Sequence, residues 1–136
     1  MHLLLALHDP THHRLRVHRP PHPPVDALLE SRSLLLHDLV HYAVEASPPI
    51  AHGFYGRLFA GAQPEALREG TEAWEDLLAV EGRVARLQTA FKRGLATDDL
   101  ALPRLRALWG AWRKVGRGQA LRLAWPPGDP EVVDAP

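Results

Sequence analysis

Two segments near opposite ends of the chain, 14-RLRVHR-19 and 120-ALRLAW-125, alternate between apolar and polar residues. In the first, Leu15 and Val17 fall on one side, and Arg14, Arg16 and His18 fall on the other. Strict alternation is typical of a strand with one buried face. The apolar run 2–8 ends in an Asp-Pro-Thr turn before the first segment, which indicates a β-hairpin. We therefore predict a small antiparallel sheet formed by the N-terminal hairpin and a C-terminal strand.

Helical periodicity fills the region between these segments. Residues 34–46 carry apolar side chains three or four apart, and residues 71–93 carry an apolar seam that Gly94 closes. Pro103 suits the first turn of a third helix. The stretch 53–62 is expected to form a short helix or a tight turn, and residues 25–33 either an irregular crossing or a helical turn.

The elements together predict an α+β fold in which three to four helices pack against the sheet. Residues 1–127 are expected to form a single domain and residues 128–136 a frayed tail. Proline pairs at positions 20–21 and 126–127 stop the strands beside them, since proline cannot donate to a strand ladder.

Bulk composition excludes several classes of function. A formal net charge of zero disfavours a nucleic-acid binder, although residues 104–118 combine basic and aromatic side chains. The absence of cysteine excludes disulfides, thiolate metal sites and cysteine nucleophiles. No apolar run approaches the roughly 20 residues that span a membrane, and no GxSxG nucleophile motif is present. We expect a cytoplasmic protein that contacts no membrane, its N-terminus a strand instead of a signal peptide.

The stretch 34-LLLHDLVHYAVEA-46 has the strongest chemical character. His37 and His41 are four residues apart, so they share one face of a helix and could hold Zn²⁺ or another divalent metal. A catalytic zinc needs a third protein ligand. Glu45 continues the face, His52 could fold back after the Pro48-Pro49 turn, and Glu72 lies on a following helix.

The segment HDLVH resembles the HExxH signature of the zincin metallohydrolases, with aspartate in place of glutamate. The resemblance covers five residues and implies metal-assisted hydrolysis, with Asp38 as the general base. The longer stretch 37-HDLVHYAVE-45, followed by Gly-Phe-Tyr-Gly, resembles a pattern of small, uncharacterised bacterial proteins. No activity follows from that second resemblance.

A non-enzymatic interpretation stands beside the metal hypothesis. Asp38 or Ser33 could cap the helix, and His41 could be an internal residue hydrogen-bonded to Glu45. The seam 73–91 would then pair with a protein partner or, in a homodimer, with a second copy through helix 71–93. The histidines of the N-terminal hairpin are expected to face solvent.

Overall fold

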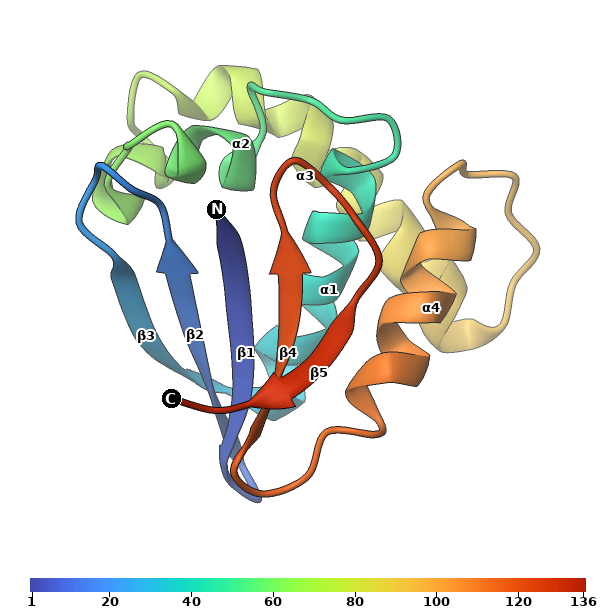
Figure 1. Cartoon of the computed structure of the whole chain (residues 1–136). Helices are drawn as coiled ribbons and strands as arrows, with labels where there is room; N and C mark the ends of the chain where they lie inside the picture. Colours follow the sequence, from blue (N-terminus) through green and yellow to red (C-terminus); the bar gives the residue numbers. More distant parts are fainter.

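A computed structural model describes all 136 residues and contains one antiparallel sheet of five strands. The strands lie in the order β3-β2-β1-β4-β5 (Figure 1). Their bounds are β1 His2–Asp9, β2 His12–His18, β3 Val25–Glu30, β4 Gln119–Ala124 and β5 Glu131–Asp134. The predicted α+β fold is confirmed, because β1 and β2 form the N-terminal hairpin and the C-terminal strand β4 pairs with the other edge of β1.

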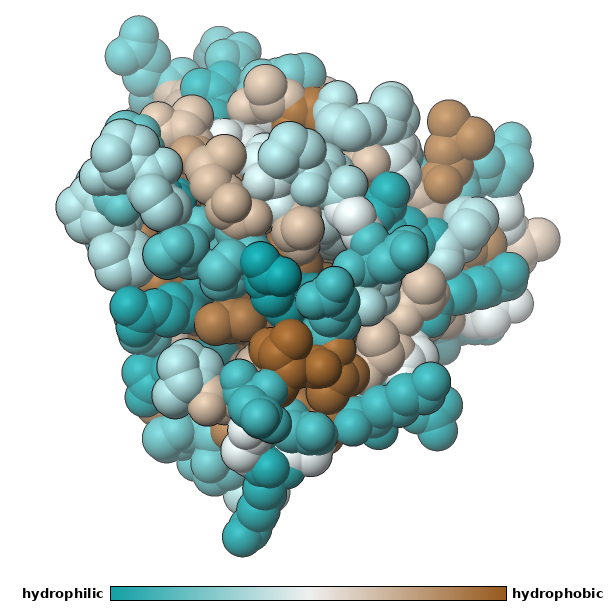
Figure 2. All heavy atoms as spheres, viewed as in Figure 1, coloured by the Kyte–Doolittle hydropathy of each residue, from teal (hydrophilic) through white to brown (hydrophobic).

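The pairing register places like side chains on the same face of the sheet. Leu3 lies opposite Val17 on β2 and Leu123 on β4, and all three are buried. The residues that alternate with these along each strand, such as Arg14 and Arg16 on β2, point to the other face of the sheet. Figure 2 shows a small hydrophobic area among hydrophilic side chains on that face. The alternation in the sequence therefore predicted the buried face correctly.

Both edge strands differ from the expectations. Residues 25–30 form β3 instead of an irregular crossing or helical turn, and Asp26 lies 3.1 Å from Arg14 and 3.3 Å from Arg16 on β2. The expectation of a frayed tail at 128–136 is wrong for Glu131–Asp134, which pair with β4 as β5. Neither edge strand has a fully buried residue, so the apolar alternation that marks a half-buried strand is weak in their sequences.

Four α-helices and one 3₁₀ helix connect the strands. They are α1 Ser31–Glu45, α2 Phe54–Phe59, η1 Pro64–Leu67, α3 Trp74–Arg93 and α4 Leu102–Trp112. Neither Ser33 nor Asp38 caps α1; the side chain of Glu30 accepts the N–H groups of Arg32 and Ser33 instead. Gly94 ends α3 in the left-handed conformation with φ 63°, as predicted.

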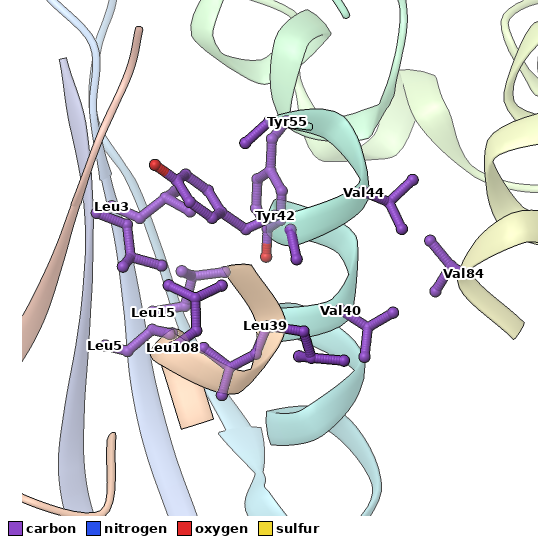
Figure 3. Packing of buried hydrophobic residues seen from close by; sticks show 14 of the residues in the cluster. Leu3, Leu5, Leu15, Leu39, Val40, Tyr42, Val44, Tyr55, Val84 and Leu108 are labelled. Atoms are coloured by element: carbon purple, nitrogen blue, oxygen red, sulfur yellow. The ribbon is translucent and has the colours of Figure 1, made fainter. Parts of the chain in front are cut away.

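Helix α1 lies at the centre of the molecule, with the sheet on one side and α3 on the other (Figure 1). Leu39 and Tyr42 face the leucines of the sheet, whereas Val40 and Val44 face Val84 of α3 (Figure 3). Every residue from Leu39 to Glu45 is buried as a result. This double covering explains why the second half of α1 is apolar almost all round, apart from His41 and Glu45.

The predicted seam of α3 packs inside the chain. Leu77, Val84 and Leu87 are buried in the core shared with α1, so these residues are not exposed to a partner. Leu78 is the one large apolar side chain of this helix that is exposed. None of the helices has the length and apolar character needed to cross a bilayer.

Candidate metal centre

His37 and His41 lie one turn apart on α1 and project from the side that faces α3. Their ring centroids are 4.9 Å apart with an interplanar angle of 74°. The side chain of His37 is 37% exposed, whereas His41 is 4% exposed. The pair therefore extends from the protein interior to the surface, as the i,i+4 spacing allows on a helix.

Glu81 of α3 completes a group of three possible metal ligands. Its Oε1 lies 2.7 Å from His41 Nε2, and its Oε2 lies 3.8 Å from His37 Nε2. One ligand atom from each of the three residues lies within 4.8 Å of the other two. These three side chains could hold a metal ion.

Glu45 lies behind His41 and fixes the orientation of its ring. The carboxylate is fully buried, and its Oε2 lies 3.0 Å from His41 Nδ1. It also accepts the backbone N–H groups of Tyr55 and Gly56 at the start of α2, at 3.1 and 3.0 Å. A carboxylate that holds one ring nitrogen leaves the other nitrogen directed outward, which is the usual second layer around a histidine ligand.

Hydrogen bonds within this group of residues raise the pKa of His41 and lower the pKa of Glu81. Burial opposes the positive charge on His41, but hydrogen bonds to Glu45 and Glu81 outweigh it and raise the imidazole pKa to about 9. Hydrogen bonds from His37 and His41 lower the pKa of Glu81 to about 2. His41 is thus a cation between two carboxylates, and an ion bound at Nε2 would replace its outer proton.

The structure brings together two of the five candidate ligands. His37 and His41 converge with Glu81, whereas His52 is exposed and outside the group; its backbone carbonyl accepts from Arg57. Glu45 contacts His41 from the side opposite Glu81 and is likewise outside the group. Glu72 precedes α3 and lines a separate cleft beside α2.

Asp38 points away from the two histidines. Its Oδ2 lies 2.9 Å from Nε2 of His13 on β2, on the sheet side of α1. Successive helical residues turn by about 100°, so the residue after His37 leaves the face that His37 and His41 share. The geometry gives Asp38 no contact with the metal group and no place as its general base.

Glu81 was not among the sequence candidates. It lies next to Val80 and four residues after Leu77, at the edge of the apolar seam of α3. A carboxylate at the edge of a buried seam was the available signal, but it did not indicate which helix the seam would contact.

A scan against protein-family models and searches of curated proteins and solved structures found no match to this chain.

Proposed function

We propose that this protein binds a divalent metal ion through His37, His41 and Glu81. The observation that carries the proposal is the convergence of three ligand atoms from two helices, with Glu45 behind His41. In a tetrahedral zinc site, bonds of about 2.0–2.1 Å place neighbouring ligand atoms roughly 3.4 Å apart. The two Glu81 distances, 2.7 and 3.8 Å, lie on either side of that value.

The ligand types favour a transition metal over Mg²⁺ or Ca²⁺. Imidazole nitrogens suit Zn²⁺, Fe²⁺ and Ni²⁺, whereas Mg²⁺ and Ca²⁺ prefer oxygen ligands. Two histidines and one glutamate form the protein part of some catalytic zinc sites, which keep a fourth position for water. The side chains of His37 and Glu81 are 37% and 27% exposed, so water can reach an ion held between them.

An open position of this kind would support metal-assisted hydrolysis. The resemblance of HDLVH to HExxH implies the same activity. The metal would acidify its bound water, and the base would have to be a group other than Asp38. The alternative of a non-enzymatic interaction protein built on the 73–91 seam has less support, because the central seam residues are buried within the chain.

Metal titration of three matched variants tests the binding proposal. Untagged protein is freed of metal with a chelator, and Zn²⁺ binding is followed by calorimetry. We expect one ion per wild-type chain. His37→Ala and Glu81→Gln each remove one ligand and should weaken binding at least about 100-fold, more than loss of a second-layer partner does. His52→Ala keeps all three ligands and should bind like the wild type.

His37 is the preferred ligand to remove because its side chain is partly exposed and its 3.8 Å contact with Glu81 is loose. A thermal melt of each metal-free variant checks that the fold is intact. Wild-type protein that binds no ion, or a folded His37→Ala variant that binds as tightly as the wild type, would exclude the proposed site.

A further inference from the structure

A second polar cluster lies on the opposite side of α1 from the metal group. The side chain of Ser31, at the first position of α1, lies with its Oγ 3.2 Å from Nδ1 of His13. The other ring nitrogen of His13, Nε2, lies 2.9 Å from Oδ2 of Asp38. A hydroxyl, an imidazole and a carboxylate are therefore connected in the order found in serine hydrolases, with the partners of the two ring nitrogens exchanged.

The imidazole of this cluster is held rigidly. His13 is fully buried, although hairpin histidines were expected to face solvent, and its ring meets Trp112 edge-on. Asp38 is also hydrogen-bonded to Tyr55, whose hydroxyl stays protonated because burial raises its pKa well above the usual value. In the tautomer whose Nε2–H donates to Asp38, Nδ1 is the acceptor that faces the Ser31 hydroxyl.

The backbone of Ser31 is fixed as well. Its N–H donates to the carbonyl of Thr11 at 2.8 Å, next to the turn that precedes β2. The side chain of Glu30 accepts the backbone N–H groups of Arg32 and Ser33 and caps the N-terminus of α1. Of the three side chains, Ser31 and Asp38 retain partial exposure. Ser31 is therefore the member of the cluster that is both fixed and open to solvent at the helix end.

Ser31 also lines a groove of about 480 Å³ between α1, α3 and α4. The apolar part of the lining consists of Leu35, Leu36, Phe91 and Trp109, and the charged part consists of Arg32 and Lys92. Apolar walls of this kind suit an acyl chain, and Arg32 and Lys92 place two positive charges on the same groove.

We propose that Ser31, His13 and Asp38 form a serine esterase site that takes esters with a short apolar acyl chain. Ser31 Oγ attacks the acyl carbonyl while His13 Nδ1 removes the hydroxyl proton, and Asp38 stabilises the imidazolium. The ester bond then breaks, and His13 returns the proton to the departing alkoxide. His13 then takes a proton from a water molecule, whose oxygen attacks the Ser31 acyl ester. The proton passes from His13 to the departing Ser31 Oγ, and the carboxylic acid is released.

This reaction uses no metal ion and none of the three metal-binding residues. The esterase proposal therefore stands or fails independently of the proposed metal function. A chelator that removes any bound metal ion should therefore leave the esterase rate unchanged.

Hydrolysis of p-nitrophenyl butyrate tests the proposal, with Ser33 as the matched control. Ser33 is exposed and two residues further along the same helix end, and no hydrogen bond joins its hydroxyl to a histidine. Ser31→Ala should lower the wild-type rate at least about 100-fold, the usual loss of a proton-transfer pair, while Ser33→Ala should not change it. Ser31→Ala removes one partly exposed hydroxyl and should melt within a few degrees of the wild type.

Labelling with a fluorophosphonate gives a readout that does not depend on the chosen ester. Trypsin cleaves after Arg32 and places Ser31 and Ser33 in different peptides, so mass spectrometry identifies the modified serine. We expect the label on the Ser31 peptide, and its loss in Asp38→Asn. An unlabelled Ser31 in folded protein, or a Ser31→Ala variant that hydrolyses the ester at the wild-type rate, would overturn the assignment.

Discussion

Glu45 connects the end of α1 to the start of α2 through its hydrogen bonds. A fully buried carboxylate is costly unless donors surround it, and Glu45 receives one side-chain and two backbone hydrogen bonds. The two backbone donors belong to the first turn of α2, where the helix dipole also favours a negative charge. One carboxylate thus orients His41 and stabilises the start of α2.

The close approach of Glu45 to α2 explains the glycine that precedes this helix. A Cβ atom on Gly53 would overlap the Glu45 carboxylate, which is fixed by its three donors. We expect Gly53→Ala to destabilise the fold by about 1–3 kcal/mol, the usual cost of overpacking a buried site. Urea unfolding at neutral pH measures the change.

Gly110 offers the matched control for this substitution. It lies inside α4, and an added Cβ would meet no atom within 4 Å. Gly110→Ala should therefore stabilise the fold by about 0.5–1 kcal/mol through helix propensity. Equal effects of the two alanines would mean that Glu45 can move away from Gly53.

Strand β5 is one of the two strands that the sequence did not predict. It pairs with β4 so that Val132 lies opposite Leu121 and Val133 opposite Ala120, both of which are fully buried. The N–H of Ala135 also donates to the carbonyl of Gly118 at 2.8 Å. Strand β5 and Ala135 therefore cover the edge of β4, whose backbone N–H and C=O groups would otherwise lack a strand partner.

Removal of residues 129–136 should consequently lower the stability of the protein. Several backbone hydrogen bonds worth about 0.5–1.5 kcal/mol each are lost, and we expect a total loss of about 2 kcal/mol or more. Thermal unfolding followed by circular dichroism measures the shift. Deletion of Pro136 alone, which lies beyond β5, should leave the midpoint unchanged; a frayed tail would make the two truncations equivalent.

Arg83 connects three parts of the chain and contributes to the stability of the whole molecule. It lies on α3, and its guanidinium donates to both carboxylate oxygens of Asp99, at 3.0 and 2.8 Å, in the connection to α4. It also donates to the carbonyl of Ser47, just after α1, at 3.1 Å. A bidentate pair of this kind fixes distance and orientation together.

Acid titration should reveal this ion pair. The hydrogen bonds from Arg83 lower the pKa of Asp99 below its ordinary value of 3.8. A depressed carboxyl pKa adds stability that is complete above the unfolded-state pKa and is lost as pH falls through the folded-state pKa. Asp99→Asn should therefore cost about 1–2 kcal/mol at pH 7 and progressively less below about pH 4.

Urea unfolding of the wild type and of Asp99→Asn at pH 7 and at pH 3 measures this difference. Asp76→Asn is a suitable control, because the Asp76 side chain is 68% exposed in its pair with Arg57 and surface pairs contribute little. A gap between wild type and Asp99→Asn that stays constant down to pH 3 would contradict the assigned role.

The sequence by itself determined the elements whose periodicity was strong. Leu15 and Val17 alternate with arginines and predicted the buried side of β2, and the spacing of Leu77, Val84 and Leu87 predicted α3. The four-residue interval between His37 and His41 also fixed their common helix face. These are properties of a single element, and local geometry is enough to predict them.

Only the tertiary structure decided which residues from other elements meet these faces. Glu81 joins the two histidines because α3 packs on α1, and Ser31 joins His13 because α1 begins beside the turn that precedes β2. Periodicity identifies an apolar face but does not identify what packs against it. The third ligand and the second polar cluster therefore depend on how α1 is covered on both sides, which is a property of the whole chain.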